Sequence, residues 1–322
     1  MAFRILSLDG GGIRGIIEAV ILSEVEKLIN QPLNKYFDLI AGTSTGSIVG
    51  TGIALGLKSE EILELFRQKG QIIFPYTSRW SVKRIGLVLK YGVSAPKFSN
   101  QGLIKALQEQ FGNAKLSDLD TSPRLLITSY DTLDRETIVF KSWQKYKPWA
   151  NANLWEICTC SASAPTYFPA YLLKTPDKDY SLIDGGVGAN NPTACAVAEA
   201  LRLNYSIREI SVLSIGSGNT TSSIPFEKVH GWGVGQWIWA GRLIEVLFDA
   251  SADVNDYITR QVINSPDTEN EGNLPYLRLQ PNITNSMMDD ASIQHINRLI
   301  DLTKNYIESN REILANFLLQ NA

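Results

Sequence analysis

The chain has 322 residues, of which 44% are hydrophobic and 20% are charged, and its formal net charge is −3. This composition predicts a soluble globular protein with a sizeable core, one or two domains long. It excludes a global attraction to nucleic acid and a membrane span, since no apolar run reaches 18 residues. Because a strand is predicted two residues after Met1, no signal peptide is expected.

Strands and helices alternate from the start of the chain. Residues 3–8 predict a strand, and residues 13–29 predict an amphipathic helix. Residues 37–41 predict a second, buried strand, and residues 47–55 predict a helix of small residues after it. Ser59 is predicted to cap the next helix.

The alternation continues with a helix from Ser99, strands at 124–130, 137–143 and 180–183, a helix at 193–203 and a strand at 209–215. Strands separated by helices favour an α/β fold with three layers, α/β/α, and a mostly parallel central sheet. Ligands bind such sheets beyond the carboxyl ends of the strands. Since no repeat or linker divides the chain, residues 1–322 are expected to form one domain with 221–322 as its mainly helical C-terminal part.

The turn after the first strand is rich in glycine and reads Asp9-Gly10-Gly11-Gly12-Ile13-Arg14-Gly15. The backbone amides of its first three glycines carry no side chain beside them and stand at the start of a helix, where they can hold an anion. Arg14 has two compatible roles here: a salt bridge that fixes the loop, or a positive field at the anion pocket.

The second strand leads into Gly42-Thr43-Ser44-Thr45-Gly46, which matches the G-x-S-x-G nucleophile elbow. Such an elbow is a sharp strand-to-helix turn that exposes a serine hydroxyl at the end of the strand. Gly42 and Gly46 shape the turn, and Ser44 is the candidate nucleophile. A serine nucleophile beside an amide-lined anion pocket is the minimum equipment for acyl transfer.

A carboxylate follows the predicted strand at 180–183. Asp184 is succeeded by Gly185 and Gly186, which let another part of the chain approach closely. Asp184 is therefore a candidate general base, with a turn aspartate that bonds its own backbone as the alternative.

These three segments resemble the signature blocks of the patatin-like phospholipases, in the same order and at similar spacing. A fourth block, residues 161–169, resembles the family's segment between nucleophile and aspartate, and the resemblance covers residues 3 to about 220. It implies a patatin-like lipid acyl hydrolase that cleaves glycerolipid esters, phospholipase A-type, through a Ser44–Asp184 dyad. The implied oxyanion hole comprises the amides of Gly10, Gly11 and Gly12, supported by Arg14, and no metal or organic cofactor is implied.

Several alternatives stay open from the sequence. His230 and His295 both follow Asp184, so a Ser-His-Asp triad is formally available. Residues 10–15 also satisfy G-x-G-x-x-G, the dinucleotide-binding fingerprint, although the second strand ends in the elbow rather than in a ribose-binding acid. An acyltransferase with the same acyl-enzyme and a lipid-binding regulator that keeps the fold are further candidates.

Two segments have the composition of a lipid-contacting surface. Residues 74–91 mix aromatic, aliphatic and cationic side chains, which suits an anionic membrane surface, and an ordinary helix with a solvated basic face is the alternative. Residues 232–248 are rich in Trp and Gly and could cap an acyl groove or fill a core. The sequence thus predicts a glycerolipid substrate, peripheral membrane contact and no nucleic-acid partner.

The three cysteines, Cys158, Cys160 and Cys195, have no disulfide-framework spacing. An odd number of cysteines in such an arrangement predicts reduced thiols in a cytoplasmic protein. No histidine accompanies them at metal-ligand spacing, so no metal site is expected.

Overall fold

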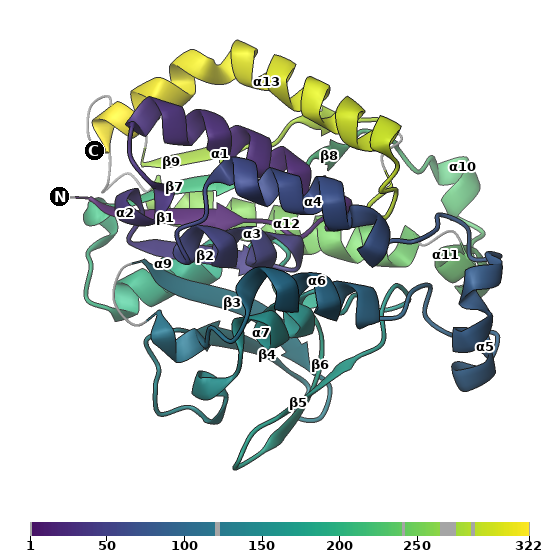
Figure 1. Ribbon diagram of the computed structural model, residues 1–322. Helices are drawn as coiled ribbons and strands as arrows, with labels where there is room; N and C mark the ends of the chain where they lie inside the picture. The colour runs from purple at the N-terminus through teal and green to yellow at the C-terminus, as the bar shows by residue number, and fades with distance from the viewer. Residues whose placement is uncertain (1, 120–122, 240–241, 265–274, 285–286, 322) are drawn as a thin grey trace.

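The computed structural model describes residues 2–119, 123–239, 242–264, 275–284 and 287–321 (Figure 1). Its strands are β1 (Phe3–Leu8), β2 (Leu39–Thr43), β3 (Arg124–Asp131), β4 (Glu136–Lys141), β5 (Tyr171–Lys174), β6 (Asp179–Asp184), β7 (Ile210–Ile215), β8 (Asn219–Thr220), β9 (Tyr276–Leu279) and β10 (Asn282–Ile283). Its α-helices are α1 (Gly15–Ile29), α2 (Leu33–Tyr36), α3 (Thr45–Ala54), α4 (Ser59–Ile73), α5 (Ile85–Tyr91), α6 (Gln101–Phe111), α7 (Leu154–Ser161), α8 (Gly186–Ala189), α9 (Thr193–Arg202), α10 (Phe226–Val229), α11 (Val234–Trp239), α12 (Arg242–Ile263) and α13 (Ile293–Gln320). Short 3-10 turns are η1 (Gly12–Arg14), η2 (Val82–Arg84), η3 (Leu116–Asp118), η4 (Pro148–Asn151) and η5 (Ile207–Glu209).

The main sheet has eight strands within the described residues, in the order β5-β6-β3-β2-β1-β7-β9, with β4 paired to β3. The central strands β3, β2, β1, β7 and β9 run parallel to one another. By contrast, β4 and β6 run antiparallel to β3, and β5 runs antiparallel to β6. The predicted mostly parallel sheet is therefore confirmed.

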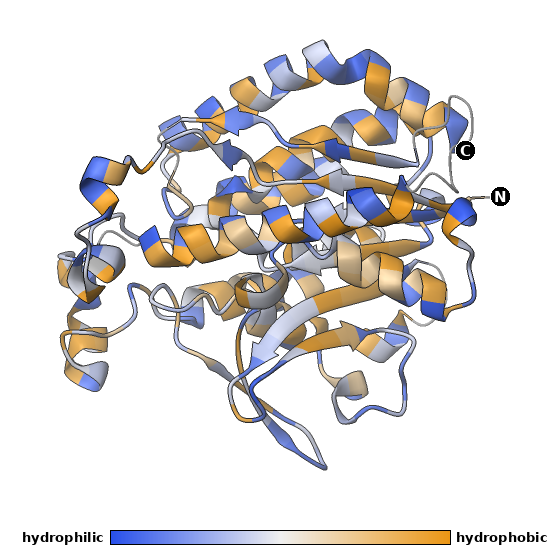
Figure 2. Ribbon diagram, turned by 180° about the vertical axis from the view of Figure 1, so that it is seen from behind, coloured by the Kyte–Doolittle hydropathy of each residue, from blue (hydrophilic) through white to orange (hydrophobic). Residues whose placement is uncertain are grey.

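Helices cover both faces of this sheet, as alternate strand residues require. Leu6 and Ile40 lie in the core that the sheet shares with α1, α3, α4 and α13. Their neighbours Ile5 and Leu39 lie in a second core, shared with α9 and the end of α12. Figure 2 shows the hydrophobic residues along the strands between the two helical layers, so the predicted three-layer α/β/α fold is confirmed.

The C-terminal part contributes more than helices. Strand β9 pairs with β7 at one edge of the sheet, and α13 packs along α1. The helix expected to start at a capping Ser59 also begins differently. Lys58 occupies the N-cap position, and the Ser59 hydroxyl instead donates a hydrogen bond to Glu26 (2.7 Å).

The pairing of β2 and β6 along the same edge of β3 brings Ser44 and Asp184 together. Strand β4 occupies one edge of β3 from Leu126 onward, so β2 and β6 share the other edge. Strand β2 pairs up to Thr43, opposite Thr128, whereas β6 ends at Asp184, opposite the adjacent Ser129. Because β2 and β6 run in opposite directions, their carboxyl ends meet, and the residues that follow β2 lie beside Asp184.

Candidate active site

Ser44 occupies the tight turn between β2 and α3. Its backbone has φ 53° and ψ −120°, a conformation with positive φ that a residue with a side chain seldom adopts. Glycine is needed on both sides, because a Cβ at Gly42 would lie 2.3 Å from the Gly46 carbonyl oxygen. A Cβ at Gly46 would lie 2.3 Å from the carbonyl oxygen of Leu8. Ser44 therefore lies at the apex of a tight strand-to-helix turn that requires glycine at positions 42 and 46.

The Ser44 hydroxyl is bonded to a carboxylate. Ser44 Oγ donates to Asp184 Oδ2 at 2.6 Å, and Asp184 Oδ1 accepts a hydrogen bond from the Gly186 amide at 2.7 Å. Asp184 is fully buried. This burial raises the pKa of Asp184 to about 7, although the bonds from Ser44 and Gly186 act in the opposite direction. A carboxylate with a pKa near 7 can exchange a proton with a serine hydroxyl at neutral pH.

The end of α7 connects the nucleophile turn to the aspartate. The Ser161 hydroxyl accepts a hydrogen bond from the Ser44 amide at 2.7 Å. The carbonyl of Ser161 accepts from the Gly185 amide, and the carbonyl of Ser163 accepts from the Asp184 amide. The sequence singles out the segment at 161–169 but indicates no role for Ser161. In the structure, this segment is hydrogen-bonded to the backbone of both Ser44 and Asp184 and so positions the two side chains relative to each other.

The glycine-rich loop lies across from Ser44. The Gly10 amide donates to the Asn190 carbonyl at 3.0 Å, so the loop has two amides to offer an anion rather than the three expected. The amides of Gly11 and Gly12 have no hydrogen-bond acceptor among the described residues. Gly12 has φ +62° and lines the same pocket as Ser44. These two amides are therefore the candidate oxyanion donors.

Arg14 stabilises this loop through a hydrogen bond to its backbone. Its guanidinium is buried and donates to the Gly11 carbonyl (3.4 Å) and to the Thr220 hydroxyl (3.3 Å). Of the residues that the structure describes, none brings a carboxylate within 4.0 Å of it, so the salt-bridge role considered above is not formed. Burial lowers the pKa of Arg14, while Asp249 and Glu245 favour its charge from a distance.

Asp9, which precedes the glycine-rich loop, forms an ion pair that no sequence pattern indicates. Arg278 of β9 donates from two nitrogens to the two carboxylate oxygens of Asp9, at 2.5 and 3.2 Å. Both side chains are buried, and Arg278 also donates to Ser214. This ion pair ties the last residue before the glycine loop to the sheet edge.

We expect Asp9→Ala to lower the free energy of unfolding by about 3 kcal/mol, because Arg278 would keep a buried charge without its main partner. Thermal and denaturant unfolding measure this loss. The double variant Asp9→Ala/Arg278→Met is the control, since it removes both charges and should recover part of the stability. Equal stability of Asp9→Ala and the wild-type protein would contradict the expectation.

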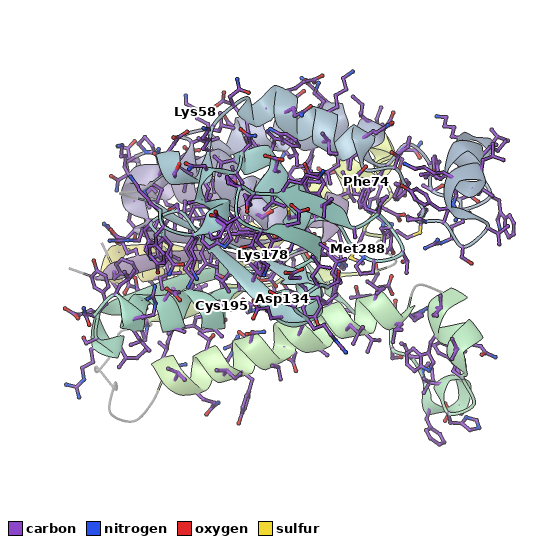
Figure 3. The ribbon with its side chains drawn as sticks, turned by 90° about the horizontal axis from the view of Figure 1, so that it is seen from below. Lys58, Phe74, Asp134, Lys178, Cys195 and Met288 are labelled. Carbon is purple, nitrogen blue, oxygen red and sulfur yellow. The ribbon has the colours of Figure 1, made fainter. Side chains whose placement is uncertain are left out.

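An apolar pocket opens beside Ser44 and Asp184. Besides Ser44 and Asp184, its lining includes Ile48, Phe66, Ile73, Phe74, Leu103, Phe168, Phe248 and Met288. Figure 3 shows Phe74 and Met288 on the side of the molecule where α5 and α11 lie (Figures 1 and 3). The free volume is about 50 Å³, room for a few water-sized groups. An acyl chain of ordinary length therefore enters only if these side chains move.

The two histidines take no part in this arrangement. His230 lies exposed on the surface beside α10, where its ring is near the Phe226 carbonyl (3.1 Å) and stacks on the Phe226 ring. His295 lies in the first turn of α13, where Arg298 is its neighbour at 3.1 Å. Neither lines the pocket around Ser44, and the hydroxyl of Ser44 is hydrogen-bonded to a carboxylate.

The site combines a strained serine on a strand–helix turn, its hydrogen bond to a buried carboxylate, and a neighbouring glycine-rich loop with two amides that have no acceptor among the described residues. These groups are those of an α/β/α protein that carries out acyl transfer. The family model of the patatin-like phospholipases matches residues 6–197. Patatin-like protein 2 of rice (Oryza sativa subsp. indica) is 30% identical, over 95% of this chain and 84% of its own. Patatin-like protein 2 of Arabidopsis thaliana is 32% identical, over 92% of this chain and 80% of its own.

The chain belongs to the patatin-like phospholipase family. In fold it also resembles human GIVD cytosolic phospholipase A2, with a TM-score of 0.52 at 12% identity, over 99% of this chain and 60% of that one. Membership of this family supports a lipid acyl hydrolase activity. It decides against the dinucleotide-binding interpretation of the glycine-rich loop.

Proposed function

We propose that this protein hydrolyses fatty-acyl esters of glycerolipids, phospholipase A-type, with Ser44 as nucleophile and Asp184 as its base. The observation that carries the proposal is the 2.6 Å hydrogen bond from Ser44 Oγ to Asp184 Oδ2, inside an apolar pocket. Incubation of mixed glycerolipids with the wild-type protein and with Ser44→Ala tests it, with released fatty acids and lysolipids as the readout.

In the proposed reaction, Ser44 Oγ attacks the ester carbonyl carbon while its proton passes to Asp184 Oδ2. The carbonyl oxygen becomes an oxyanion, which the amides of Gly11 and Gly12 stabilise. Asp184 then gives the proton to the departing glycerol oxygen, and the acyl group remains on Ser44. Water then attacks the carbonyl carbon of this acyl-enzyme while Asp184 takes its proton. The bond from that carbon to Ser44 Oγ breaks, Asp184 returns the proton to Ser44 Oγ, and the fatty acid is released.

The bond between Asp184 Oδ1 and the Gly186 amide has a separate purpose in this mechanism. It fixes the carboxylate plane, so that Oδ2 stays directed at Ser44. The dry surroundings keep the carboxylate basic enough to accept a proton, since water that would stabilise its charge is excluded.

The proposed reaction uses a hydroxyl, a carboxyl and two amides, all supplied by the chain. Among the described residues, no three His, Cys, Asp or Glu side chains are grouped as metal ligands. We therefore expect hydrolysis to persist in excess EDTA. A loss of activity that calcium restores would contradict this expectation.

The protein is proposed to work on membranes as a peripheral, cytoplasmic enzyme. No described helix has the length and apolar character of a bilayer span. The segment at 74–91 divides in two: Phe74 packs in the interior against Phe98, whereas η2 and α5 project at one end of the molecule (Figure 1). There Trp80 is 82% and Leu89 is 82% exposed, beside the exposed cations Lys83 and Lys90.

Arg84 is mostly buried, unlike these two lysines. It is 8% exposed, and its guanidinium donates to the carbonyls of Val93, Ala95 and Pro96. Replacing Arg84 would release the loop that follows α5, so it is unsuited to a test of membrane binding. The segment at 232–248 forms α11 and the start of α12, with Trp232 edge-on to Trp237. Residues 240 and 241 and the side chain of Trp239 lie outside the described residues.

We expect Lys83→Gln/Lys90→Gln to weaken binding to anionic vesicles by about 30-fold at low salt, since each cation near such a surface contributes about 1 kcal/mol. Vesicle co-sedimentation measures this. Hydrolysis of a short soluble ester should be unchanged, because neither lysine contacts the pocket. Unchanged co-sedimentation would show that α5 is an ordinary solvated helix.

A further inference from the structure

A second and larger hollow lies next to the apolar pocket that contains Ser44. This groove has a volume of about 950 Å³ and runs between α5 and α11, which lie side by side at the same end of the molecule (Figures 1 and 2). Its apolar walls comprise Trp80, Ile85, Val88, Leu89, Val93 and Ile238. A volume of this size is in the range of sites that hold one small organic molecule, and the walls suit an alkyl chain.

The segment that supplies most of the groove lining carries charge of one sign, and Asp289, the partner of Lys97, also attracts Arg79 from a distance. Residues 74–98 contain five cationic side chains and no Asp or Glu. Two of these cations are committed elsewhere: Arg84 donates to four backbone carbonyls, and Lys97 forms a buried ion pair with Asp289. Arg79 lines the groove, and its Nη2 donates a hydrogen bond to the Thr166 carbonyl at 3.1 Å. Within the described ranges, its guanidinium has no carboxylate within 4.0 Å.

The groove and the apolar pocket that contains Ser44 are lined by adjacent residues of the chain. Thr166 lines the groove, and the next residue, Tyr167, lines the pocket that contains Ser44. Thr166 has φ +70°, a strained conformation for a β-branched residue, and its carbonyl accepts from both Arg79 and the Lys97 amide. The strained peptide thus holds the Arg79 guanidinium at the border between the two hollows.

We propose that this groove binds the part of a phospholipid that is not cleaved, with its phosphate on Arg79 and its second acyl chain along α5 and Ile238. The inference rests on the proposed function, because the scissile chain would occupy the pocket beside Ser44. Arg79 has a planar fork of N–H donors, which matches the oxygens of a phosphate diester. The protein would then select phosphate-bearing glycerolipids over neutral or glycosylated ones.

The test compares two substrates that differ only in the phosphate headgroup. Dihexanoylphosphatidylcholine and dihexanoylglycerol are assayed as dissolved monomers, so membrane binding plays no part. Arg79→Gln should lower kcat/KM for the phospholipid by about tenfold or more and leave the diacylglycerol within twofold, since a hydrogen bond to a charged group is lost. Arg67→Gln, the same change on the exposed face of α4, should leave both substrates unchanged.

Two further variants separate recognition of phosphate from general damage. Arg79→Lys should restore part of the phospholipid activity, because it keeps the charge and loses the fork. Ile238→Ser should weaken hydrolysis of dihexanoylphosphatidylcholine more than that of the single-chain hexanoyl lysophosphatidylcholine. An unchanged ratio between phospholipid and diacylglycerol in Arg79→Gln would overturn the proposal, whether both activities stay or both fall.

Binding can be measured without the reaction. In the Ser44→Ala background, Arg79→Gln should weaken binding of dihexanoylphosphatidylcholine by a similar factor in calorimetry. If the wild-type protein hydrolyses neither substrate, the proposed function fails, whereas the groove is still judged by this binding. Equal affinity with and without Arg79 would overturn the groove assignment alone.

Discussion

Ser44→Ala is expected to abolish ester hydrolysis and to leave the fold intact. The change removes one hydroxyl from the apex of a turn whose geometry is set by Gly42 and Gly46. The Ser44 amide would keep its bond to Ser161, and α3 would keep its start. Without the hydroxyl, no acyl-enzyme can form, so the loss should exceed that of any other single change. Released fatty acid and the thermal unfolding midpoint, measured together, check this result.

A fluorophosphonate probe gives a second view of the same residue. It should label Ser44 and no other serine, because reaction requires a hydroxyl bonded to a base. Ser217 is the informative comparison, since it also lies in a glycine-flanked turn close to the loop. Its hydroxyl is buried and donates to the Gly10 carbonyl at 2.7 Å, and no carboxylate among the described residues is hydrogen-bonded to it. Labelling at Ser217 in the wild-type protein would overturn the assignment of Ser44.

The sequence predicted those features of the site that depend on a few neighbouring residues, namely the turn around Ser44 and the carboxylate at the end of a strand. The elbow around Ser44 follows from a buried strand, two glycines and a following helix, all within about twenty residues. Asp184 was identified in the same way, as a carboxylate at a strand end. Their juxtaposition was expected from a parallel sheet, in which carboxyl ends share one edge. In the structure they meet because β6 runs against β3 and ends where β2 ends.

Contacts between distant segments were beyond local reasoning. Arg278 is a lone cation on a late strand, and no pattern around it indicates that β9 would pair with β7 and reach Asp9. The engagement of the Gly10 amide by Asn190 depends in the same way on how two loops cross. The composition of residues 74–91 predicts a lipid-contacting surface, but it does not indicate which of the cationic side chains are buried. Arg84 and Lys83 are neighbours, yet one is buried and the other is exposed.

Asp184→Asn is expected to lower hydrolysis by about 100-fold or more, the usual contribution of a general base. The amide keeps the shape of the carboxyl group and can accept the bond from Ser44, but it cannot take up the serine proton. His230→Ala and His295→Ala should each retain most activity, since neither residue lines the pocket. A histidine change as damaging as Asp184→Asn would replace the dyad with a triad.

The pH dependence of the wild-type protein tests the same assignment. Because the pKa of Asp184 is raised to about 7, kcat/KM for a soluble ester should fall as pH drops below about 7, when the base becomes protonated. The folded protein also binds this proton more tightly than the unfolded chain, whose aspartate titrates near 3.8. Stability should therefore fall as pH rises from about 4 to about 7 through this group. Asp184→Asn lacks the titration, so it should be slow at every pH and lose the stability cost above pH 7. A kcat/KM profile that stays flat from pH 5 to 8 would show that another group takes the serine proton.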